Sequence, residues 1–244
     1  PCPRSKKVKF SVSKGHSIFV HKNNLFFTHP PSYNGRDFRI FSKMGSDMRK
    51  VIIYVYKNRA SGKKLREEGL GRRVSAELKT NFFMPFLATY LIKKKLGFMS
   101  HCSSVYIKDK LNLFMGKTES GKSTIAEFWY KCRGAVVFND DKAALTVRNK
   151  VPYFYNLPWS GVLTDILGPK LGDGTRIDRI FFISRGIKNI LRRLNKTEAA
   201  SRIFQNSFPV FWHKECLGYT LGLCPTISNL VPCYDLKFVK DDSV

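Results

Sequence analysis

The sequence predicts an α/β fold in which helices flank a mixed sheet, preceded by a small β-rich module at the N-terminus. Three observations lead to this fold class. Residues 5–58 hold short runs with strand patterning, residues 111–132 read as a strand, a glycine-rich loop and a helix, and further strand and helix patterns follow to residue 239. We therefore expect two domains, a β-rich module over residues 1–74 and a larger α/β domain over residues 75–244.

The N-terminal module is predicted from short apolar runs that are separated by turn signals. A hairpin turn is expected near Asn23 and Asn24, because asparagine tolerates the left-handed backbone. Residues 57–71 are rich in Lys, Arg, Gly and Glu, and they predict a loop or linker. The predicted strands are residues 8–12, 17–20, 25–28, 38–41 and 51–56.

The second domain is predicted to open with a helix over residues 75–96, which Pro85 should kink or divide. Gly134 is expected to end the helix that begins near Lys122, and Asn195 is expected to cap a later helix. The remaining strands are predicted over residues 99–107, 111–115, 135–138, 143–147, 152–155, 177–183 and 233–239, the remaining helices over residues 122–132, 197–208 and 212–223, and a glycine-rich loop over residues 161–175.

The chain is strongly basic. Lys and Arg number 43 against 18 Asp and Glu, which gives a formal net charge of +25. A charge of this size creates a positive field over much of the surface and favours an anionic partner, nucleic acid included. The basic residues are spread along the whole chain, so a solvated basic surface without a polyanionic partner is the alternative.

Hydropathy and cysteine spacing indicate the cellular setting. No apolar stretch reaches about 18 uninterrupted residues, so no membrane span is expected. No secretory signal is expected either. The six cysteines include no C-x-x-C pair, so zinc is not expected, and free thiols in a reducing cytoplasm are the interpretation.

A different glycine-rich segment, residues 116–124, fits the pattern G-x-x-x-x-G-K-[ST], which is typical of a nucleotide-phosphate site. This segment is called the glycine-rich loop from here on. Its glycines let the backbone turn successive N–H groups toward phosphate oxygens, and the following helix N-terminus adds partial positive charge. Lys122 would reach the β- and γ-phosphates of ATP, and Ser123 would hold Mg²⁺. The alternative is a glycine-rich connection that binds nothing. The predicted nucleotide-binding residues are Gly116, Lys117, Thr118, Glu119, Ser120, Gly121, Lys122, Ser123 and Thr124.

Asp140 and Asp141 stand side by side at the end of a predicted buried strand. Phosphoryl transfer uses such a pair, because one carboxylate can order Mg²⁺ while the other accepts a hydroxyl proton. The strand should deliver both side chains to the sheet edge that also carries the glycine-rich loop. The alternative is a solvated turn at the end of a strand.

His101, the glycine-rich loop and the run ending in Asp140 and Asp141 together resemble the catalytic core of the bacterial HPr kinase/phosphorylase family and its shorter relatives. The resemblance implies a core built like that of phosphoenolpyruvate carboxykinase, and a kinase that moves the γ-phosphate of ATP onto a serine hydroxyl. The resemblance also implies that Asp140 is the general base and that Asp141 and His101 support it. Ser123 and Asp141 would then be the ligands of Mg²⁺. The resemblance covers residues 98–239, including residues 157–161, 180–183 and 231–236.

Three features depart from that family. Glu119 stands where its members usually have glycine, which places a carboxylate close to the phosphates. The later glycine-rich signature of the bifunctional members is not found, so reverse phosphorolysis is not implied. The net charge of +25 is foreign to an enzyme that acts only on a small carrier protein.

The sequence therefore predicts an ATP- and Mg²⁺-dependent kinase whose hydroxyl acceptor is anionic: a protein, a peptide, a nucleic acid or a small molecule. The alternative is a nucleotide-switched regulatory or nucleic-acid-binding protein without kinase activity. For Arg185, Arg192 and Arg193 we favour a solvated helix face, with contact to an anionic group as the alternative. The sequence leaves a homo-oligomer open.

Overall fold

The computed structural model describes residues 10–13, 16–21, 24–28, 38–45, 50–57, 84–157 and 174–239. The chain divides into two compact units, Pro1–Tyr90 and Leu91–Val244, and each is described by itself. The predicted domain boundary at residues 74 and 75 lies outside the described residues. Within the described ranges, no helix is long and apolar enough to cross a membrane.

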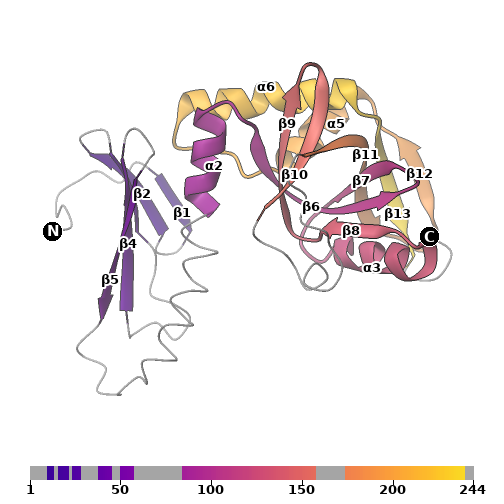
Figure 1. Ribbon diagram of the computed structural model, residues 1–244, viewed down its shortest axis with the longest axis horizontal. Helices are drawn as coiled ribbons and strands as arrows, with labels where there is room; N and C mark the ends of the chain where they lie inside the picture. Colours follow the sequence, from indigo (N-terminus) through magenta and orange to yellow (C-terminus); the bar gives the residue numbers. More distant parts are fainter. Residues whose placement is uncertain are drawn as a thin grey trace. The chain divides into compact units, whose positions relative to one another are not determined.

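The N-terminal unit contains a five-stranded antiparallel sheet whose strands follow one another in chain order (Figure 1). The predicted strands of this region are confirmed, with small shifts at their ends. Phe27 and Met44 are each only 2% exposed, and the ring of Phe27 meets that of Phe86 edge-on, with centroids 4.7 Å apart. The strands are β1 (Phe10–Ser13), β2 (His16–His21), β3 (Asn24–Thr28), β4 (Phe38–Met44) and β5 (Val51–Lys57).

Helix α2 (Met84–Lys93) begins one residue before Pro85. A proline in the first turn of a helix lacks only an N–H that has no helical acceptor there, and the predicted kink or division at Pro85 stays a prediction, because the residues before Met84 lie outside the described ranges. The main chain continues regularly past it, and the hydroxyl of Thr89 donates to the carbonyl oxygen of Pro85 at 2.6 Å. Residues 75–83 of the predicted helix lie outside the described residues.

The second unit is built on an eight-stranded mixed sheet. Its strands are β6 (Phe98–Ile107), β7 (Lys110–Met115), β8 (Val136–Asn139), β9 (Lys142–Arg148), β10 (Val151–Asn156), β11 (Thr175–Arg185), β12 (Ile190–Arg193) and β13 (Cys233–Phe238). Seven strands follow the order β10-β9-β6-β7-β11-β13-β12, and β8 pairs with β6. Strand β11 runs parallel to β7 and β13, whereas the other pairs are antiparallel. The predicted α/β class with a mixed sheet is therefore confirmed.

Helices cover both faces of this sheet (Figure 1). Helix α3 (Lys122–Arg133) lies on one face, and α5 (Lys196–Gln205) and α6 (Lys214–Leu230) lie on the other. Helix α3 ends as predicted at Gly134, whose φ of 63° lies in the left-handed region. Asn195 caps α5 as predicted, because its side chain accepts a hydrogen bond from the N–H of Glu198 at 2.8 Å.

The core between α3 and the sheet fixes the start of the helix against the end of β7. Ile125 and Ala126 of α3 are buried against Phe114 of β7 and Phe181 of β11. The rings of Phe114 and Phe181 stack with centroids 5.3 Å apart, and Trp129 meets Phe114 edge-on at 5.4 Å. Each large apolar side chain contributes about 1.5–3 kcal/mol by leaving water. The strand and the helix on either side of the glycine-rich loop are therefore firmly packed.

The sequence does not predict strand β12, which pairs antiparallel with β13. All four of its residues are exposed, so they lack the alternation of buried and exposed positions that indicates a strand. The favoured interpretation of Arg192 and Arg193 is thus corrected from a helix face to a strand, and Arg192 forms an ion pair with Glu198 at 2.8 Å. The predicted loop over residues 161–175 lies largely outside the described residues.

Candidate active site

Residues 116–121 of the glycine-rich loop connect β7 to α3. A Cβ atom at Gly116 would lie 2.8 Å from the carbonyl oxygen of Ile183, and one at Gly121 would lie 2.4 Å from the ring of Phe238. Gly121 also has a φ of +98°, a conformation that residues with a side chain rarely adopt. The path of this connection therefore depends on glycine at both ends.

Lys122 begins α3 and points back over the loop. The residue is only 6% exposed, and its Nζ donates to the carbonyl oxygens of Gly116 at 2.8 Å and Lys117 at 2.9 Å. Burial lowers the pKa of Lys122 from its ordinary value, against smaller opposing effects of the Cys102 thiol and the Asp141 carboxylate. The ammonium therefore lies where burial opposes its charge, with two neutral carbonyls as its hydrogen-bond acceptors.

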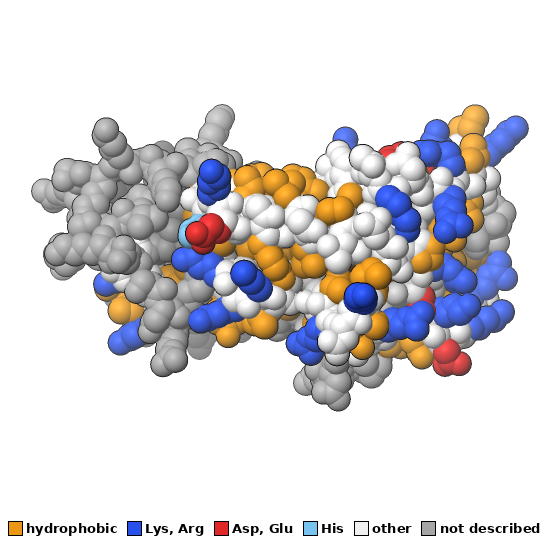
Figure 2. Space-filling model, turned by 90° about the horizontal axis from the view of Figure 1, so that it is seen from above, with side chains coloured by type: hydrophobic (Ala, Val, Ile, Leu, Met, Phe, Trp, Pro, Cys, Tyr) orange, Lys and Arg blue, Asp and Glu red, His pale blue; other side chains and the backbone are white. Residues whose placement is uncertain are grey.

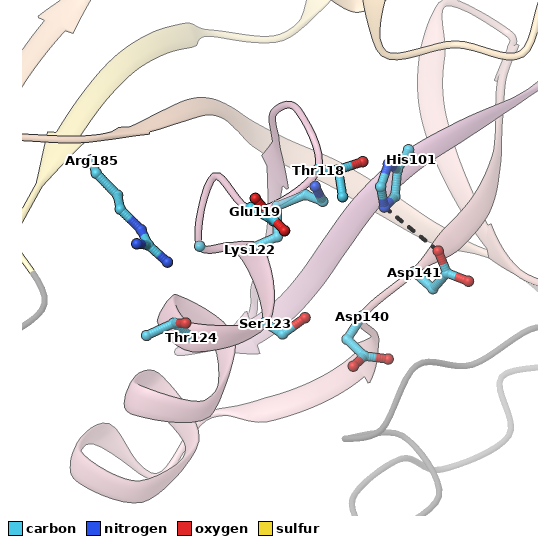
Figure 3. A pocket seen from close by; sticks show the side chains of 10 residues that line it. His101, Thr118, Glu119, Lys122, Ser123, Thr124, Asp140, Asp141 and Arg185 are labelled. Atoms are coloured by element: carbon cyan, nitrogen blue, oxygen red, sulfur yellow. Dashed lines mark ion pairs between the residues drawn. The ribbon is translucent and has the colours of Figure 1, made fainter.

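Glu119 lies in the loop with a φ of +66°. Glycine adopts this left-handed region readily, whereas a residue with a Cβ atom does so at a cost of roughly 1–2 kcal/mol. The exposed carboxylate lines the same pocket as Lys122 (Figure 3). The loop thus carries a negative charge at a position where the backbone is strained for a residue other than glycine.

Asp140 and Asp141 follow β8 in a tight turn that Asn139 organises. The Oδ1 atom of Asn139 accepts hydrogen bonds from the N–H groups of Asp141 at 2.7 Å and Lys142 at 3.0 Å. The side-chain amide of Asn139 donates to Asn156 of β10, whose own amide donates to the main chain of β8 at 2.9 Å. Asparagine side chains form such local turns by bonding N–H groups two residues ahead. Neutral amides from two strands therefore hold the turn.

The two aspartates have different surroundings. Asp140 is only 5% exposed, whereas Asp141 is partly exposed and contacts two basic side chains. Nε2 of His101 lies 3.5 Å from one oxygen of Asp141, and the ammonium of Lys142 contacts the other oxygen. Burial, followed by the nearby charge of Lys122, lowers the pKa of His101 below its ordinary value. His101 is therefore uncharged at neutral pH.

These groups meet in one pocket of about 360 Å³, a volume within the range of small-molecule sites (Figure 3). Its lining residues are His101, Thr118, Glu119, Gly121, Lys122, Ser123, Thr124, Asp140, Asp141 and Arg185. Of the predicted site residues, Gly116, Lys117 and Ser120 belong to the loop but do not line the pocket. The structure thus brings His101, the two aspartates and the end of the loop together, while their roles stay predictions.

Three residues of the site have no role in the sequence prediction: Asn139, Lys142 and Asn156. Arg185 is expected at an anionic group only as the alternative, and the favoured helix face is wrong for it, because Arg185 ends strand β11 and lines the pocket. The turn at Asn139 could have been predicted from the sequence, because an asparagine at the end of a strand favours a turn. Asn156 and Arg185 carry no such signal, since each reaches the site from a different strand of the sheet. Their contribution depends on tertiary structure.

The residues present fit a nucleotide phosphate group with Mg²⁺. The Lys122 ammonium and the free main-chain N–H groups at the start of α3 lie at this pocket, and both are donors that suit phosphate oxygens. Ser123, Asp140 and Asp141 supply the hard oxygen atoms that Mg²⁺ prefers. In the described ranges, no three His, Cys, Asp or Glu side chains form a metal site by themselves. Mg²⁺ suits such a site, because it usually takes one or two carboxylates and completes its shell with phosphate and water.

Comparison with known proteins gives a fold likeness only. No family model matches the chain, and no curated protein matches it. Among solved structures, the chain is similar to the Hpr(Ser) kinase/phosphatase from Coxiella burnetii, with a TM-score of 0.34 and 11% sequence identity. The match covers 58% of this chain and 85% of that one. A likeness of this size assigns no activity to the chain.

Proposed function

We propose that the chain is a phosphotransferase that uses ATP and Mg²⁺ to phosphorylate a hydroxyl group. The observation that carries the proposal is a single pocket that Lys122 and Ser123, at the end of the glycine-rich loop, line together with Asp140 (Figure 3). A site that only binds nucleotide needs the loop. Transfer to a hydroxyl also uses a carboxylate within reach of the acceptor, and the pocket supplies one.

The loop side of the pocket binds the phosphates. An ammonium has three N–H donors, and Lys122 uses two of them at the carbonyls of Gly116 and Lys117, so one remains for a phosphate oxygen. The N-terminus of α3, at the same place, adds partial positive charge from its free main-chain N–H groups. Both groups act on the end of the nucleotide that reacts.

The acid side of the pocket activates the acceptor. The hydroxyl oxygen bonds to the γ-phosphorus while the bond from that phosphorus to the bridging oxygen breaks, and ADP leaves with the electron pair. The hydroxyl proton passes to the carboxylate of Asp140. His101 is uncharged at neutral pH and contacts Asp141, so it steadies the neighbouring carboxylate. The turn built on Asn139 keeps both acids in place.

Ser123 and Asp141 would hold Mg²⁺, which neutralises phosphate charge when it is bound. Asp141 already shares its carboxylate with the ammonium of Lys142. A Mg²⁺ ion at Asp141 would therefore compete with Lys142, whereas an ion at Asp140 would not. The dependence of activity on Mg²⁺ thus distinguishes the two aspartates.

We propose further that the acceptor is anionic. The chain carries a net charge of +25, and Figure 2 shows Lys and Arg side chains spread over the described part of one face, with few acidic ones between them. Contacts from several basic side chains to a polyanion weaken as salt rises, because counterions are released on binding. The KM of the acceptor should therefore rise with ionic strength. A salt-independent KM would point to a neutral acceptor.

The proposal is tested by incubating the protein with γ-labelled ATP and a cell extract separated into protein, RNA and small-molecule fractions. The label should enter one fraction with the wild-type chain and should fail to do so with Asp140→Asn. The basic surface favours one competing function, a nucleotide-switched nucleic-acid-binding protein. That function would give no label in any fraction, together with a nucleic-acid affinity that changes when ATP is added.

A further inference from the structure

Arg185 is the last residue of β11, at the sheet edge from which the glycine-rich loop leaves β7. Strands β7 and β11 are parallel, and Met115 pairs with Phe182. Three further residues along β11 therefore bring Arg185 beside the loop. A Cβ atom on Gly116 would touch the carbonyl of Ile183, which shows how closely the two strand ends approach.

The main chain around Arg185 is tied to the same residue that packs against the loop. The N–H of Gly186 donates to the carbonyl oxygen of Phe238 at 2.9 Å, and Asn189 accepts from the N–H of Val239 at 2.9 Å. Phe238 is 3% exposed, and its ring lies against Gly121. One buried aromatic residue therefore fixes both the end of the loop and the turn that carries Arg185.

The guanidinium of Arg185 is exposed and points into the pocket from the side opposite the aspartates (Figure 3). No hydrogen bond or ion pair of its side chain is found among the described residues. Arg192 and Arg202, in contrast, both pair with Glu198. Among the described residues that line the pocket, Lys122 and Arg185 are the only Lys or Arg. The pocket therefore has an acidic end and a basic end, with the loop between them.

We propose that Arg185 binds the α- and β-phosphates of the nucleotide and so fixes the direction in which the nucleotide lies. This inference rests on the proposed function. Transfer to a hydroxyl places the γ-phosphate beside Asp140, so the remainder of the nucleotide extends along the loop toward Arg185. A guanidinium can contact two phosphate oxygens at once, which suits it to a polyphosphate chain. The acceptor then enters from the side of His101 and Asp141.

The test measures binding of ATP and ADP, each with Mg²⁺, by calorimetry without an acceptor. Arg185→Ala should weaken both nucleotides by about 10-fold and to the same extent, because the contacts lie on phosphates that both contain. Arg185→Lys should recover part of the lost affinity, since lysine keeps the positive charge but lacks the paired N–H donors of the guanidinium. Arg133→Ala is the matched control. This exposed arginine is the last residue of α3, the helix that follows the glycine-rich loop. Its removal should change the affinity for neither ATP nor ADP.

Two outcomes overturn the inference. Unchanged affinities in Arg185→Ala would show that the side chain does not touch the nucleotide, and a loss for ATP alone would place it at the γ-phosphate. Lys122→Ala, measured in parallel, separates this failure from a failure of the proposed function. If Lys122→Ala loses nucleotide while Arg185→Ala does not, only the inference fails. If the wild-type chain binds neither nucleotide, the proposed function and the inference fail together.

Discussion

The two sides of the pocket are held in different ways. The turn that carries Asp140 and Asp141 is stabilised by hydrogen bonds of the side-chain amides of Asn139 and Asn156. Neither asparagine lines the pocket. The loop is fastened by Lys122, whose ammonium bonds two of the loop's own carbonyls. The acid side is thus organised by residues outside the proposed chemistry, whereas the loop is held by the ammonium that we propose as a phosphate ligand.

Substitutions on the two sides of the pocket should therefore have different effects. A change on the acid side alters the chemistry without altering the framework, as long as the two asparagines remain. A change at Lys122 should alter the conformation of the loop and, on the proposed function, its affinity for phosphate, because the same ammonium has both roles there.

Lys122→Ala should produce the largest loss of nucleotide affinity. Removing the ammonium deletes a charge-assisted contact to the phosphates and two bonds that shape the loop, so we expect a loss of at least ~2 kcal/mol. Calorimetry with ATP and Mg²⁺ measures it. Lys110→Ala is the control, because this exposed lysine lies at the opposite end of β7. Equal ATP affinity in Lys122→Ala and wild-type protein would contradict the phosphate role of the loop.

Lys142→Ala should sharpen the assignment of the acid side. Lys142 contacts the Asp141 carboxylate, so its removal frees an oxygen for Mg²⁺ and should lower the Mg²⁺ concentration at half-maximal turnover by about threefold to tenfold. The measurement is a Mg²⁺ titration of activity at saturating ATP. An unchanged Mg²⁺ concentration at half-maximal turnover would indicate that Asp140, and not Asp141, binds the ion.

Glu119→Gly should tighten nucleotide binding. Glycine removes the strain at a φ of +66° and also removes a carboxylate near the phosphates. The expected gain in ATP affinity is about threefold to tenfold, with a small rise in the melting temperature. Glu119→Gln separates the two causes, since it removes the charge and keeps the strain. A weaker affinity in both variants would mean that Glu119 itself contacts the ligand.

His101 should give the smallest effect, in the pH dependence of stability. Its pKa is lowered in the folded chain from the ordinary value of 6.5, so the unfolded chain binds more protons between the two values. Stability should therefore fall as the pH drops through this window. His101→Gln should reduce that fall, as seen in melting temperatures between about pH 7 and pH 5. Parallel curves for both proteins would show that His101 is not a buried neutral group.

The sequence predicts those parts of the site whose signals are local. The loop lies between an apolar strand and a helix, the cap at Asn195 is a short-range pattern, and the aspartates follow an apolar run. Each of these features depends on residues close together in the chain. The fold class follows from them, and so does the expectation that the loop and the acids share one edge of the sheet.

The parts that the sequence does not predict depend on strand order. Strand β12 has no alternating pattern, so its pairing with β13 is visible only in the folded chain. Asn156 supports the acid turn from β10, and Arg185 reaches the pocket from β11, although neither lies near the motifs in sequence. The turn at Asn139 is an intermediate case, since its signal is local but its second partner is not.

The role of Asp140 is tested by comparing the wild-type chain with Asp140→Asn in two assays, ATP binding and transfer of the γ-phosphate to the acceptor fraction. If Asp140 accepts the hydroxyl proton, its contribution appears only in the transition state. We predict ATP affinity within about twofold of wild type and transfer slower by about 10²–10⁴. Undiminished transfer in Asp140→Asn would contradict the account, because the carboxylate that distinguishes a kinase from a nucleotide switch would then have no role.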